Sequence, residues 1–215
     1  MSRDASSRIA VMLAVAIALA GCQTGGAPGG ASTDSAPVPP PSTAGVQGAR
    51  ASFAGFSFEV PQGWVSEQPS SGMRLAQYRI PPAAGDPQAG ECALFHFPGQ
   101  GGTVQANLDR WYGQFEQPDG GSTAERARVE TFTAAGGLAV TLTDVSGTYL
   151  ASMGSMSPMG SVPADHPSPA RTGYRMVAGV VETAAGPWFL KCVGPEATMA
   201  AAAPSIRSSL QTARP

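Results

Sequence analysis

The sequence predicts an α+β domain over residues 51–215, with a mainly antiparallel β-sheet flanked by helices. Three observations support this prediction. The β-rich runs are joined by short turns, as in hairpins, and not by helical crossovers. Only two stretches have the apolar spacing of a helix. The elements follow the order β-rich, helix, β-rich, helix, which places helices against an antiparallel sheet.

The first β-rich part contains three expected strands. Residues 56–60 alternate apolar and polar side chains and end at the turn Pro61-Gln-Gly63. Residues 73–80 also alternate, and a loop over residues 81–90 follows. Residues 92–97 complete the group.

A helix is expected after Thr103, which suits an N-cap. Val104, Leu108, Trp111 and Phe115 recur at steps of four, three and four residues, which places them on one face. The preceding loop, residues 99–103, could be a phosphate-binding helix start or a tight loop with a cap. A P-loop needs a lysine where Gly102 stands, so the tight loop is favoured.

The second β-rich part contains two expected hairpins and the last helix. Residues 129–135 and 138–150 meet at Gly136-Gly137, and residues 174–183 and 188–193 meet around 184–187, with a loop over residues 151–172 between the hairpins. Pro195 suits the first position of a helix that continues to residue 212. Its apolar stripe is Met199, Ile206 and Leu210, and Pro204 should kink or split it.

The N-terminus has the pattern of an export signal. Arg3 and Arg8 precede an apolar run over residues 9–20, too short for a bilayer that needs roughly 20 residues. Leu19-Ala20-Gly21-Cys22 resembles the bacterial lipobox, in which the cysteine thiol takes the lipid. The resemblance implies a signal peptide over residues 1–21 and lipid on Cys22. The alternative is an ordinary signal peptide with a chance cysteine.

The region 22–50 is expected to be the lipidated cysteine and a disordered tether rich in Pro, Gly, Ser and Ala. As flexible coil it would span about 30 Å. The expected location is therefore the surface of a membrane, after export. By resemblance to sorting rules, Gln23 favours the outer membrane, facing the periplasm, if the host is Gram-negative.

Three segments of the domain resemble PsbP-like domains. The opening, residues 56–64, is similar to the short strand and Pro-Gly-Trp turn of that family. Residues 107–115 look like its central helix, and residues 188–195 like its last strand before an Ala-rich helix. The resemblance covers nearly all of residues 53–212. It implies an antiparallel sheet between helices and a role in binding another protein, since members of the fold share no active site.

Composition and motifs then limit the function. The net charge is −2 without any basic run, so nucleic-acid binding is not expected. Neither His96 nor His166 precedes a credible nucleophile, and Gly-x-Ser-x-Gly is absent. We therefore expect no enzyme and no cofactor. The prediction is a non-enzymatic binding or adaptor module whose partners are the membrane, through Cys22, and an envelope protein.

Two cationic residues are candidate partner contacts. Arg110 lies off the apolar stripe of its helix, where it could pair with Glu91 or Asp109 or simply be solvated. Lys191 is the only lysine and alternates with Cys192, so the two should face opposite sides of their strand. The alternative for Lys191 is a plain outward-facing lysine.

With Cys22 assigned to lipid, two cysteines are left, Cys92 and Cys192, and an even number can pair in an oxidising compartment. A bridge that closes about 100 residues would stabilise the fold by about 4–5 kcal/mol in the chain-entropy model. The alternative is two buried free thiols on strands that are not neighbours. The family resemblance places ordinary apolar residues at these positions, which favours free thiols.

A methionine-rich stretch carries the second functional hypothesis. Met153, Met156 and Met159 follow one another at three-residue spacing, and His166 lies nearby. Thioethers are soft ligands that can hold Cu(I), so the alternative function is a copper-handling lipoprotein. The simpler interpretation is a loop whose methionines fill irregular gaps.

Overall fold

The computed structural model describes residues 48–150 and 169–215. The predicted signal peptide, the lipid site at Cys22, most of the tether, and the methionines and His166 of the 151–168 stretch lie outside these ranges. Arg50, the last residue of the predicted tether, is the first residue of strand β1.

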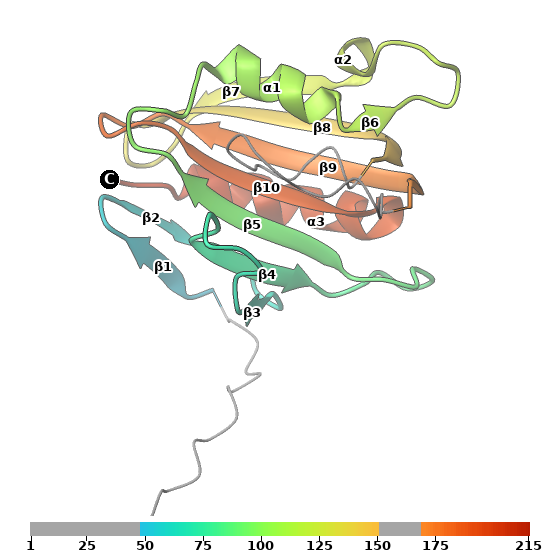
Figure 1. The fold of residues 1–215 in the computed structure, drawn as a ribbon. Coiled ribbons are helices and arrows are strands. Elements are labelled where there is room, and N and C mark those ends of the chain that lie inside the picture. The colour runs from blue at the N-terminus through green and yellow to red at the C-terminus, as the bar shows by residue number, and fades with distance from the viewer. Residues whose placement is uncertain (1–47, 151–168) are drawn as a thin grey trace, which may run out of the picture. The chain divides into compact units, whose positions relative to one another are not determined.

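The main sheet has eight strands, and the prediction of an α+β fold is confirmed (Figure 1). Its order is β3-β4-β5-β10-β9-β8-β6, with β7 also paired to β8, and every pairing is antiparallel. The strands are β3 (Val65–Glu67), β4 (Ala76–Ile80), β5 (Gly90–His96), β6 (Phe115–Glu116), β7 (Arg128–Thr133), β8 (Ala139–Tyr149), β9 (Arg171–Val181) and β10 (Trp188–Pro195).

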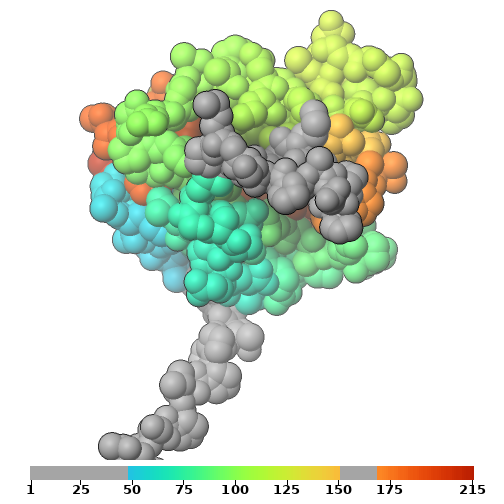
Figure 2. All heavy atoms as spheres, viewed as in Figure 1, coloured from blue at the N-terminus to red at the C-terminus, as the bar shows by residue number. Residues whose placement is uncertain are grey.

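A separate two-stranded sheet contains β1 (Arg50–Phe53) and β2 (Phe56–Glu59). Strand β2 is the expected one, whereas β1 was not predicted. Figure 2 shows this hairpin in blue on the opposite side of the molecule from the green and yellow-green segment that contains α1 (Val104–Tyr112) and α2 (Thr123–Arg126).

The first helix begins as predicted and ends earlier. Thr103 is its N-cap, and its side chain accepts a hydrogen bond from the N–H of Ala106 at 3.2 Å, in agreement with the tight-loop interpretation. Phe115 does not belong to the helix, because the chain leaves helical conformation after Gly113 and pairs as β6. Phe115 is nevertheless buried with Leu108 and Trp111.

A kink or a split was predicted at Pro204, and the split is wrong, because the last helix, α3 (Glu196–Gln211), passes through this residue as one element. Its apolar stripe of Met199, Ile206 and Leu210 is buried as expected. Packing of this stripe on the sheet outweighs the loss of one backbone N–H. Pro195 ends β10 and caps the helix, one position before the one predicted for it.

Two strand boundaries also differ from the prediction. Strand β4 begins at Ala76 because Arg74 N–H donates to Ser71 O at 3.1 Å in a turn. Leu75 is therefore exposed. Strand β9 begins at Arg171, inside the stretch that was expected to be loop. Its first residues continue the pairing with the end of β8, beyond a register shift between Gly147 and Tyr149.

The sheet has a separate apolar cluster on each face. One cluster contains the α3 stripe, the β1–β2 hairpin and the inward residues Leu94 and Leu190. The other contains α1 together with Phe95 and Phe189. Neighbouring residues of β5 and β10 alternate between the two clusters, as a pleated strand requires. This alternation decides which side chains reach each face.

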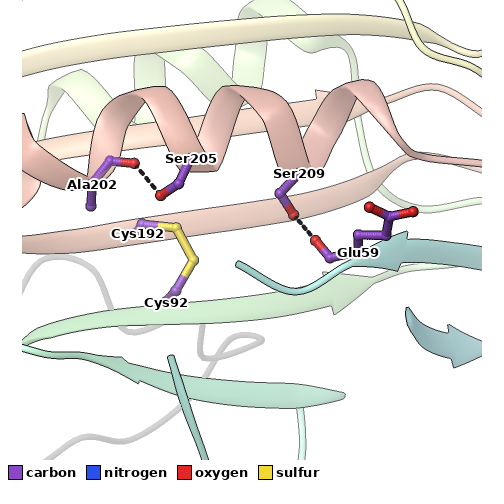
Figure 3. The surroundings of a disulfide bond; sticks show 6 residues. All are labelled: Glu59, Cys92, Cys192, Ala202, Ser205 and Ser209. Carbon is purple, nitrogen blue, oxygen red and sulfur yellow. Dashed lines mark hydrogen bonds between the residues drawn. A yellow bond between two sulfur atoms is a disulfide. The ribbon is translucent and has the colours of Figure 1, made fainter. Parts of the chain in front are cut away.

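Cys92 and Cys192 form a disulfide in the cluster beneath α3 (Figure 3). They lie directly opposite each other on β5 and β10. The alternative of thiols on strands that are not neighbours is therefore wrong. Resemblance to a family with apolar residues at these positions could not reveal a pairing that depends on this chain's register.

Candidate functional site

Lys191 lies in the middle of β10, on the face of the sheet that α1 covers. Its neighbours across the two adjacent strands are Ala93 on β5 and Ala178 on β9. Cys192 faces the other side, so the predicted alternation is confirmed. Because both neighbours of Lys191 are alanines, this part of the sheet leaves space above its surface.

That space is a cavity of about 270 Å³. Its floor comes from β5 and β10, and its walls come from the residues before β4, the end of α1, the end of β8 and the start of β9. The lining residues are Arg74, Ala89, Glu91, Ala93, Phe95, Trp111, Gln114, Tyr149, Arg171, Tyr174, Phe189, Lys191 and Val193. Three of these side chains are cationic and one is acidic.

The amine of Lys191 donates a hydrogen bond to the side-chain oxygen of Gln114, which is itself 2% exposed. Gln114 is held just after α1, where its N–H donates to Trp111 O at 3.1 Å. The amine also lies 5.6 Å from the centre of the Tyr149 ring, within range of a cation–π interaction. The contacts of Lys191 thus come from two neutral side chains.

Burial, as the largest cause, and the nearby positive charges of Arg110 and Arg74 together lower the pKa of Lys191 from its usual 10.5 to about 7. Glu91 acts in the opposite direction. The amine therefore changes charge close to neutral pH, which gives this site a proton-dependent charge.

Aromatic side chains form the apolar walls of the cavity. The rings of Tyr149 and Tyr174 are stacked, with centroids 6.2 Å apart and planes 8° apart. Arg171 lies over the Tyr174 ring at 5.6 Å. On the other side, Trp111 meets Phe189 edge to face at 6.1 Å. Such walls suit a flat apolar group.

The single acidic residue of the cavity is already paired. Arg74 forms a salt bridge of 2.7 Å with Glu91 and also donates to Gln77 Oε1 at 2.7 Å. Among the described residues, no carboxylate lies within salt-bridge distance of Lys191. The positive charges of Lys191 and Arg171 are therefore in excess over the carboxylates that the structure describes in the lining.

The two predicted contact residues have different positions. Arg110 is exposed on α1 and donates to Asn107 Oδ1, and among the described residues it pairs with neither Glu91 nor Asp109. Glu91 is engaged by Arg74, and Asp109 accepts from Gln105 at 2.7 Å. Lys191 is not the plain outward-facing lysine, because it is partly buried in the cavity.

Sequence reasoning missed most of this site. Arg74, Gln114, Tyr149 and Arg171 come from four segments, and no motif joins them. One signal was available: the only lysine of the chain lies within an apolar strand, where an unpaired charge is costly.

Other candidate features lie elsewhere. His96 stacks on Trp188, with centroids 4.1 Å apart, and its Nδ1 is 3.1 Å from Pro187 O, so it is held by its neighbours. In residues 48–150 and 169–215, no group of three or more His, Cys, Asp or Glu side chains could hold a metal. The described helices are too short or too polar to cross a bilayer.

Comparison with known proteins gives little further information. No family model and no curated protein matches the chain. One similar solved structure is a protein of unknown function from Pseudomonas aeruginosa, with a TM-score of 0.42 and 10% identity. The match covers 77% of this chain and 95% of that one.

Proposed function

We propose that this chain is an exported lipoprotein whose domain is a non-enzymatic binding module of the cell envelope, with the Lys191 cavity as its ligand site. The observation that supports it is a cavity of about 270 Å³ on one face of the sheet, in which aromatic walls surround a few converging polar groups. Small-molecule sites have this composition.

Binding can be tested with three aromatic probes of equal size: benzoate, benzamide and benzamidine. Calorimetric titration of the full chain in mild detergent should show that at least one probe binds. Ala93→Leu fills the floor of the cavity next to Lys191 and should abolish binding. Ala106→Leu makes the same change on the exposed side of α1 and should leave binding unchanged.

A chain that binds none of the three probes would contradict the ligand site. If a probe still binds the Ala93→Leu variant, the binding site of that probe lies outside the cavity. Circular dichroism must first show that the variant is folded, because Ala93 is only 3% exposed.

Anchoring rests on the lipobox resemblance of residues 19–22, after a charged and apolar leader. Cys22→Ala should move the protein from the membrane fraction to the soluble fraction, since the lipid would be missing. Thr24→Ala leaves the lipobox intact and should leave the protein in the membrane fraction. Equal membrane association of both variants would refute the lipid anchor.

The adaptor part of the proposal concerns an envelope protein. Arg110 is the candidate contact, since it is exposed on α1 and arginine is enriched in binding hot spots. Cross-linking in cells, followed by purification, should recover one stoichiometric partner from the wild type and lose it with Cys22→Ala. The absence of such a partner from both would oppose an adaptor role.

A further inference from the structure

The charge balance of the Lys191 cavity indicates what kind of ligand it accepts. Arg74 and Glu91 neutralise each other across 2.7 Å. Lys191 and Arg171 remain, and both line the same cavity. Each lies 5.6 Å from the centre of a tyrosine ring, and these two rings are stacked on each other. The excess positive charge therefore lies along the aromatic wall that these two rings form.

A cationic amine in this position needs a counter-charge. Its described hydrogen-bond partner, Gln114, is a neutral amide that is almost fully buried. Removing an ammonium group from water without an opposite charge is unfavourable, and the low local dielectric strengthens any attraction to an anion that enters. The cavity thus favours negative charge at Lys191.

Another part of the cavity is apolar. Phe95, Trp111 and Phe189 lie on the side of the sheet that α1 covers, all within one buried cluster. Ala93 leaves the floor open next to Lys191. A ligand that fits must combine one anionic group with a compact apolar body.

We propose that this cavity binds a small organic anion, with the negative group of the ligand against Lys191 and its apolar body against the aromatic wall. This inference rests on the proposed function, because it names the ligand class of the same site. Carboxylates on an aromatic ring or on a short aliphatic chain share this chemistry.

Binding of such an anion should be accompanied by uptake of a proton at Lys191. The charged groups that act on its amine are Arg74, Glu91 and Arg110, and Arg171 and both tyrosines also line the cavity. Burial and the charge of Glu91 raise the pKa of Tyr149, so its hydroxyl stays neutral. With a pKa of about 7, Lys191 is mostly neutral at pH 7.5, and the anion favours its protonated form.

Calorimetry with the full chain in mild detergent tests the proposal. Benzoate should bind at least about tenfold more tightly than benzamide or benzamidine, as expected for one charge-assisted contact. For a tenfold preference for the protonated amine, titrations in two buffers of different ionisation enthalpy should show uptake of about half a proton per benzoate at pH 7.5 and almost none at pH 6. A titration with hexanoate in place of benzoate tests whether the cavity accepts an aliphatic body as well as an aromatic one.

Three variants test whether the charge of Lys191 causes the preference for benzoate and the proton uptake. Lys191→Met should remove the preference for benzoate, whereas Lys191→Arg should retain it without proton uptake at either pH. Arg214→Met removes a positive charge at an exposed site and should change neither result. If benzamide or benzamidine binds the wild type as tightly as benzoate, the anion proposal is overturned while the binding site stands. If no probe binds, both proposals are overturned.

Discussion

Lys191 on β10 donates a hydrogen bond to the buried side chain of Gln114, although the two residues lie 77 positions apart. This contact joins the middle of the sheet to the segment that follows α1. It also places the only lysine of the chain in a cavity with aromatic walls. The chemistry of the cavity and part of the stability of the domain therefore depend on the same amine.

The stability of the domain should depend on pH through Lys191. Its pKa is about 7 in the folded state and near 10.5 when unfolded, so between these pH values the unfolded chain binds more protons. The cost of the buried charge is complete below pH 7 and falls as the pH rises towards 10.5. Relative to Lys191→Met, the wild type should gain up to about 1.4 kcal/mol of unfolding free energy per pH unit above pH 7.

Urea unfolding of both proteins at pH 6, 7, 8 and 9 measures this difference. The variant retains every other titrating group. The difference between the two free energies of unfolding at each pH therefore gives the contribution of Lys191. A difference in the free energy of unfolding that stays constant from pH 6 to pH 9 would show that the amine does not titrate near pH 7.

Removal of the disulfide should destabilise the domain. The bridge joins residues 100 positions apart, and its loss through Cys92→Ala with Cys192→Ala should lower the free energy of unfolding by about 4–5 kcal/mol in the chain-entropy model. Denaturant titration gives this value. In a Cys22→Ala background, unreduced and unfolded protein should contain no thiol that can be alkylated, and a finding of two would disprove the bridge.

Gly136 should tolerate no side chain. A Cβ there would lie 2.6 Å from Arg214 Cα and 2.8 Å from Ala213 O, and the Gly136 N–H donates to that same oxygen at 2.9 Å. Gly136→Ala should therefore displace the C-terminal segment at a cost of about 1–3 kcal/mol. Thermal unfolding measures the loss. Gly72→Ala is the matched control, since nothing lies within 4 Å of a Cβ there, and an equal loss in both would refute the close-approach argument.

The ion pair between Asp144 and Arg175 should contribute more than exposed pairs do. It is bidentate, at 2.7 and 2.5 Å, and its side chains are only 21% and 18% exposed. Asp144→Asn leaves Arg175 without its partner and should cost about 1–3 kcal/mol. Asp119→Asn breaks the exposed pair with Arg126 and should have a smaller effect. Equal losses in urea unfolding would contradict this ranking.

Some features could be predicted because they depend on neighbouring residues. The alternation of Lys191 and Cys192 placed them on opposite faces, and the spacing of Met199, Ile206 and Leu210 predicted the buried side of α3. Thr103 was recognisable as a cap from its place before the apolar stripe. Phe115 shows the limit of this reasoning, because it fits a helical spacing and yet pairs as β6.

Strand register and packing account for what could not be predicted. Periodicity cannot show that Cys92 lies opposite Cys192, that alanines flank Lys191 on both sides, or that Gln114 reaches the amine. Each of these depends on how distant segments align when their apolar faces are buried together. The continuity of α3 through Pro204 has the same origin.

The sequence by itself determined the fold class, the opposite faces of Lys191 and Cys192, and the expectation of an exported lipoprotein. The tertiary structure alone decided the order of the strands, the cysteine pairing and the Lys191 cavity. The physical reason is the separation in sequence of the residues involved. The alternation of side chains along a strand depends only on the local backbone. A cavity exists only where residues from distant segments leave space between them.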